Sequence, residues 1–74
     1  LKASPSAVAG GAPVALECVS MSAVEIYNAA GQLLSRHSFP DADSITISAP
    51  ALPGLYLITA VTSRGRFSTR LLVA

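Results

Sequence analysis

The sequence predicts an all-β protein, a small antiparallel β-sandwich of about six to seven strands. Its 74 residues suffice for one small domain, which buries roughly 60% of its unfolded surface. From Val14 onward, apolar and other residues alternate with a period of two, as in strands that offer one face to a core. Glycine, proline, asparagine and aspartate interrupt these runs at strand-length intervals.

Residues 1–13 are expected to form a linker-like lead-in, because Pro5, the Gly10–Gly11 pair and Pro13 interrupt any regular element there. An additional edge strand could form near residues 2–8. Residues 14–74 then make up the sandwich, which we expect to be immunoglobulin-like. Its predicted strands are 14–19, 23–28, 32–38, 44–48, 55–62 and 66–73.

Turn residues separate these strands. In the segment from Asn28 to Gly31, the glycine can adopt a positive φ and the asparagine tolerates one. Gly65 is the glycine expected to adopt such a strained conformation in the loop of the last hairpin. The remaining predicted breaks are residues 40–43 and 50–54.

The last two predicted strands differ in kind. Residues 55–61 are apolar on both faces, which is typical of a central strand covered on two sides. The final strand is apolar on one face only, so Arg66 and Arg70 are expected on its outer face, with Arg64 in the preceding loop.

The aromatic residues and the cysteine are interpreted mainly as packing groups. Tyr56 and Phe67 are predicted to lie in the core, and Tyr27 to be exposed or covered by a loop. Cys18 continues the alternation of its strand and should pack as a small hydrophobe.

Composition excludes several function classes. A net charge of +1 provides no basic field for nucleic acid. The longest strictly apolar run is far shorter than the ~20 residues of a membrane span. One cysteine and one histidine cannot build a zinc cluster. We therefore predict no nucleic-acid partner, no membrane span and no metal.

No pattern of catalytic residues is found either. None of the serines lies in a G-x-S-x-G elbow, and His37 is interpreted as solvated. Asp41 and Asp43 supply too few oxygen ligands for a calcium loop, and turn stabilisation is the favoured interpretation. The sequence predicts a protein that is not an enzyme and has no cofactor.

Two segments, read together, resemble a known family. Residues 24–34 read V-E-I-Y-N-A-A-G-Q-L-L. Residues 52–73 begin L-P-G-L-Y-L-I-T-A-V and continue through a glycine hairpin to a strand ending R-L-L-V. In order and spacing they resemble the type A C-terminal sorting domain of the type IX (Por) secretion system of Bacteroidetes. The family's turn and strand positions fall on Tyr27, Asn28, Gly31, Gln32, Leu52, Pro53, Gly54, Tyr56 and Gly65.

The chain departs from the family pattern at three places. It is one residue shorter between Pro53 and Gly54, and Ser4-Pro5-Ser6 stands for the usual opening Pro-Asn-Pro. Arg70 occupies a basic position that is usually lysine.

The resemblance implies a non-catalytic secretion and sorting signal. Such a domain is fused to an N-terminal cargo protein that is exported through the periplasm to the outer membrane, the cell surface or the medium. The implied partners are the outer-membrane translocon, its shuttle components and a sortase-like peptidase that removes the domain. The candidate translocon-recognition face is Arg64, Arg66, Arg70, Leu71, Leu72 and Val73.

Other interpretations remain open at this point. The arginines could simply be a solvated outer face that protects a sheet edge. The chain could be an accessory carbohydrate- or protein-binding sandwich of a secreted hydrolase, although it contains no tryptophan. It could also be a passive spacer, and an unpaired edge strand could support a dimer. We expect a fragment of a longer polypeptide with a native C-terminus.

Overall fold

The computed structural model describes all residues from Leu1 to Ala74 as strands and their connections, without a helix. The all-β sandwich predicted from the alternation is confirmed. The strands are β1 (Lys2–Ser4), β2 (Ala7–Val8), β3 (Pro13–Asn28), β4 (Leu33–Ser48), β5 (Gly54–Thr62) and β6 (Gly65–Val73).

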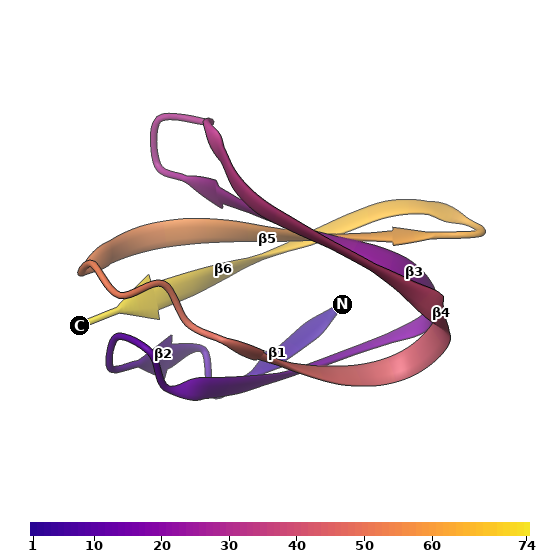
Figure 1. Cartoon of the computed structure of the whole chain (residues 1–74), viewed down its shortest axis with the longest axis horizontal. Helices are drawn as coiled ribbons and strands as arrows, with labels where there is room; N and C mark the ends of the chain where they lie inside the picture. Colours follow the sequence, from indigo (N-terminus) through magenta and orange to yellow (C-terminus); the bar gives the residue numbers. More distant parts are fainter.

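The two longest strands, β3 and β4, form an antiparallel hairpin that curves at one end of the molecule and contributes to both layers (Figure 1). The first half of β3 pairs with β1 and with the second half of β4, and we call this group the β1 layer. The second half of β3 pairs with the first half of β4 and with β5. Strand β5 pairs with β6, and β6 with β2, which completes the β5–β6 layer.

Each long strand joins two segments that the sequence predicts as separate strands. The sequence treats residues 40–43 as a break, but β4 continues through them. Likewise, β3 runs without interruption through residues 20–22. The prediction of four separate strands here is wrong, because proline, aspartate and serine bend a long hairpin at these positions instead of ending its strands.

The bend is built around an irregular stretch of β3. The register between β3 and β4 shifts between Glu17 and Met21, and Ser20 adopts a φ of 57°. The amide of Ser20 donates a hydrogen bond to Asp43 Oδ1 at 2.9 Å. The aspartate thus satisfies a backbone group that has no ladder partner at the bulge.

The lead-in of residues 1–13 contains β1 and β2, one in each layer. Strand β1 runs antiparallel to β3, whereas β2 runs parallel to the end of β6, with Ala7 opposite Leu72. The Ser4–Pro5 peptide bond between the two strands is cis. Val8 is buried in the core, so this segment connects the first strand of one layer to the last strand of the other.

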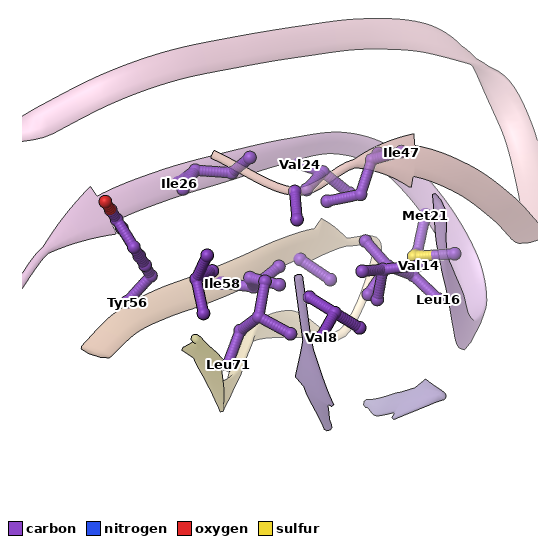
Figure 2. Close-up of a cluster of buried hydrophobic side chains, with 13 residues drawn as sticks. Val8, Val14, Leu16, Met21, Val24, Ile26, Ile47, Tyr56, Ile58 and Leu71 are labelled. Atoms are coloured by element: carbon purple, nitrogen blue, oxygen red, sulfur yellow. The ribbon is translucent and has the colours of Figure 1, made fainter. Parts of the chain in front are cut away.

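The core lies between the layers and takes side chains from both (Figure 2). Val14 and Leu16 of the β1 layer and Ile58 and Leu71 of the β5–β6 layer are fully buried. Burying an aliphatic side chain of this size contributes about 1.5–3 kcal/mol. Cys18 is partly buried and packs against this cluster, as predicted. The Cα radius of gyration of 11.2 Å matches the ~11 Å of a compact domain of this length.

Candidate functional site

The first family-like motif forms the turn between β3 and β4. Asn28 Oδ1 accepts hydrogen bonds from the amides of Ala30 and Gln32, both at 3.0 Å. The side-chain amide of Asn28 also donates to Gln32 Oε1 at 2.9 Å. Gly31 has the predicted positive φ, 84°, which costs a residue with a Cβ about 1–2 kcal/mol. Asn28, Gly31 and Gln32 therefore fix the shape of this turn.

The second motif leads into β5. The Tyr56 ring is buried, as predicted, and its hydroxyl donates a hydrogen bond to the Leu52 carbonyl at 2.7 Å. Immunoglobulin-type sandwiches contain a similar contact, the tyrosine corner. Pro53 lies exposed between Leu52 and Gly54. Gly54 and Gly65 open the two strands of the last hairpin with φ values of 152° and 124°, so these motif positions also serve backbone geometry.

A buried carboxylate that the sequence patterns did not single out lies on the outer face of the β5–β6 layer. Glu25 is only 4% exposed. Its Oε1 accepts hydrogen bonds from Arg66 Nη1 at 2.9 Å and from the Tyr27 hydroxyl at 3.1 Å. Arg36 Nη1 lies 3.8 Å from its Oε2. These partners replace the hydration whose loss would otherwise cost several kcal/mol.

No local pattern could have revealed this cluster. The alternation of β3 places Glu25 and Tyr27 on the side opposite to the core. The arginine that pairs with Glu25 lies 41 residues later in the chain. Only the antiparallel order of β3, β5 and β6 brings the two side chains together.

Polar side chains continue from Glu25 across the outer face. Thr59 lies directly opposite Glu25, and Ser68 lies opposite Thr59. Directly opposite residues on neighbouring strands share a face. The two hydroxyl oxygens are 3.0 Å apart, so this row satisfies its own polar groups.

The neighbouring rows of the outer face are apolar and open. Tyr27, Leu57 and Arg70 are directly opposite one another across β3, β5 and β6. In the next row, Leu55 lies opposite Leu72. Leu57, Leu55 and Leu72 are 40%, 47% and 51% exposed. The prediction that β5 is covered on both sides is therefore wrong. Strand β5 is central within its layer, but the second layer packs on only one of its faces.

These rows border a surface hollow of about 550 Å³. The turn between β3 and β4, which projects beyond β5 on the side away from β1 and β2, forms one wall (Figure 1). Strand β6 forms the opposite wall, and the leucines of β5 lie between them. The hollow brings together residues from three separately identified segments, among them Tyr27, Asn28, Gly31, Tyr56, Arg66 and Arg70.

The structure divides the recognition face predicted on the final strand. Leu71 and Val73 are 0% and 2% exposed and belong to the core, so a partner of the folded protein cannot reach them. Arg66, Arg70 and Leu72 lie on the outer side of β6, because Ser68 between them hydrogen-bonds to the outward-facing Thr59. Arg64 lies in the turn before β6, as predicted.

The arginines of this face differ in their surroundings. Arg66 is paired with Glu25, whereas Arg70 makes neither a salt bridge nor a side-chain hydrogen bond. Phe67 is 44% exposed, which contradicts its predicted place in the core. The reason is that β2 pairs only with the far end of β6, at Leu72 and Val73, and leaves the edge beside Phe67 uncovered.

The remaining candidate groups are dispersed. His37 and Asp41 are exposed, and Asp43 is engaged at the bend. No three histidine, cysteine, aspartate or glutamate side chains are grouped closely enough to hold a metal ion. The structure has no helix with the length and hydrophobicity needed to span a membrane.

Comparison with protein-family models and with curated proteins gives no match to this chain.

Proposed function

We propose that this chain is a non-catalytic secretion and sorting signal. It would direct a larger cargo protein through the outer-membrane translocon of a type IX secretion system to the cell surface or the medium. A sortase-like peptidase would then remove it. The observation that carries the proposal is the meeting of both family-like motifs and the final strand around one hollow.

The roles of the motif residues support a signal that is read as a shape. Asn28, Gly31 and Gln32 hold a turn, and Tyr56 anchors the entry to β5. These side chains set where backbone and neighbouring groups lie, and the same turn borders the hollow. A folded surface of this kind suits recognition by a partner protein.

The proposal is tested by attaching the chain to a reporter. The reporter is given an ordinary signal peptide for the inner membrane and is joined through its C-terminus to Leu1. In a host with a type IX system, we expect it at the cell surface, accessible to protease added to intact cells. In a host without the translocon, the same fusion should stay in the periplasm.

The decisive control concerns folding. An Ile58→Asp variant places a charge at a fully buried core position and should unfold the domain, which provides the export level expected without a folded signal. If the wild-type fusion is folded yet remains in the periplasm of the competent host, the proposal is contradicted.

A second candidate, an accessory protein-binding module, is supported by the exposed leucines of the outer face. The carbohydrate-binding version has less support, because Tyr27 is the one aromatic side chain of the outer rows and its hydroxyl is engaged by Glu25. Glycan-array binding that is lost in Tyr27→Ala would favour the carbohydrate version. Absence of any such binding is the expected result.

A further inference from the structure

The apolar end of the outer face is a contiguous surface. Leu57 lies opposite Tyr27 on one side and Arg70 on the other, and the Leu55–Leu72 pair forms the adjoining row. A single exposed leucine is ordinary on a protein surface, whereas a cluster next to a hollow is typical of an interaction site.

Charge is unevenly distributed around this surface. Arg70 borders the hollow without an acidic partner, and Arg66 and Arg36 converge on Glu25. Glu25 is the one acidic residue of these outer rows, and its carboxylate is already engaged. Of the other three acids, Glu17 lies on β3 opposite β1, and Asp41 and Asp43 lie in β4 where the long hairpin bends. The hollow therefore combines an apolar floor with one arginine, Arg70, that has no acidic partner.

We propose that this hollow is a docking site for an acidic segment of a partner protein. An apolar side chain of that segment packs on Leu55 and Leu57, and a neighbouring carboxylate pairs with Arg70. Charge complementarity selects this occupant, because a second copy of the chain would bring another unpaired arginine to the same face. The inference goes beyond the proposed sorting role, because the folded chain alone forms the hollow, whatever cargo protein is fused to it.

The chemistry of the hollow also separates this occupant from other ligands. A groove that binds single-stranded nucleic acid follows the backbone with several positive charges, whereas Arg70 is the one arginine of this hollow without an acidic partner. A volume of about 550 Å³ is within the range of about 300–1,000 Å³ that is typical of ligand pockets. A carboxylate bound by the arginine fork gains a charge-assisted hydrogen bond that a neutral polar group would not provide equally.

The test uses the isotope-labelled chain and a short blocked peptide in which leucine and aspartate alternate. We expect saturable amide shifts in NMR spectra at Tyr27, Leu57 and Arg70, with a dissociation constant of about 0.1–1 mM. A matched peptide with lysine in place of aspartate should bind about tenfold more weakly or not at all. Equal binding of both peptides, no binding, or shifts confined to other strands would overturn the proposal.

Matched variants separate the site from general charge. Arg70→Glu should weaken the aspartate peptide by about tenfold or more, whereas Arg64→Glu, the same charge change in the turn outside the hollow, should change affinity by less than about twofold. An equal loss in both variants would show that net charge alone attracts the peptide and would overturn the site. If Arg70→Glu does not fold, the affinity for the aspartate peptide is measured instead in Arg70→Gln, which only removes the charge. Leu57→Thr should weaken binding without changing charge, and unaltered affinity there would refute the apolar floor.

Discussion

Two neighbouring leucines on the final strand occupy opposite environments, and this difference can be measured. Leu71 is 0% exposed in the core, whereas Leu72 is 51% exposed on the outer face. Leu71→Ala deletes buried methyl groups and leaves a cavity, which costs about 2–5 kcal/mol. Leu72→Ala alters a surface position, where most substitutions change stability by about 0.5 kcal/mol or less.

The difference is large relative to the stability of so small a protein. At about 0.05–0.15 kcal/mol per residue, a domain of this length has a free energy of unfolding of about 4–11 kcal/mol. Each 1 kcal/mol shifts the Tm of such a domain by roughly 4–8 °C. Leu71→Ala should therefore lower the Tm by at least about 8 °C, and Leu72→Ala by at most about 4 °C.

Thermal and urea unfolding followed by far-UV circular dichroism measure the loss of stability in each of the two variants. Equal destabilisation by the two substitutions, or a larger effect of Leu72→Ala, would refute the assignment of inner and outer faces to β6. The proposed docking surface depends on that assignment, because only the outer row of β6 can meet a partner.

The other predictions concern groups that hold the backbone. Gly31→Ala should lower the free energy of unfolding by about 1–2 kcal/mol. The positive φ accounts for the whole loss, because no atom lies within 4 Å of the added Cβ. In a urea titration, Gly31→Asn should recover much of this loss. Tyr56→Phe should lower the free energy of unfolding by about 1 kcal/mol through loss of the hydrogen bond to Leu52, and an unchanged urea midpoint would contradict that role. Asp43→Ala should cost about 1 kcal/mol and speed amide exchange at Ser20, whose donor loses its acceptor; unchanged exchange there would argue against the proposed bend.

The sequence was informative where a residue's role follows from its nearest neighbours. Alternation alone placed Arg66 and Arg70 on the outer face of the final strand. Glycine identified the turn at Gly31 and the hairpin at Gly65, both of which have a positive φ. These features need only the period of a strand and the steric freedom of glycine.

Features that depend on distant partners could not be predicted. The residues around Asp43 have the composition of a break, and only the hydrogen bond to Ser20, 23 residues away, shows them to be a bend. The burial of Glu25 depends on Arg66. Alternation also cannot distinguish an apolar face that another layer covers from one that stays open, and for this reason the exposure of Leu57 was missed.

The most direct measurement of the proposed role is the fraction of a fused reporter that protease can reach on intact cells of a type IX-competent host. A sorting signal predicts that most of the reporter is accessible, and that this fraction falls to background when the translocon is deleted or when Ile58→Asp unfolds the domain. A folded wild-type fusion that remains inaccessible, or that reaches the surface equally without the translocon, would contradict the account.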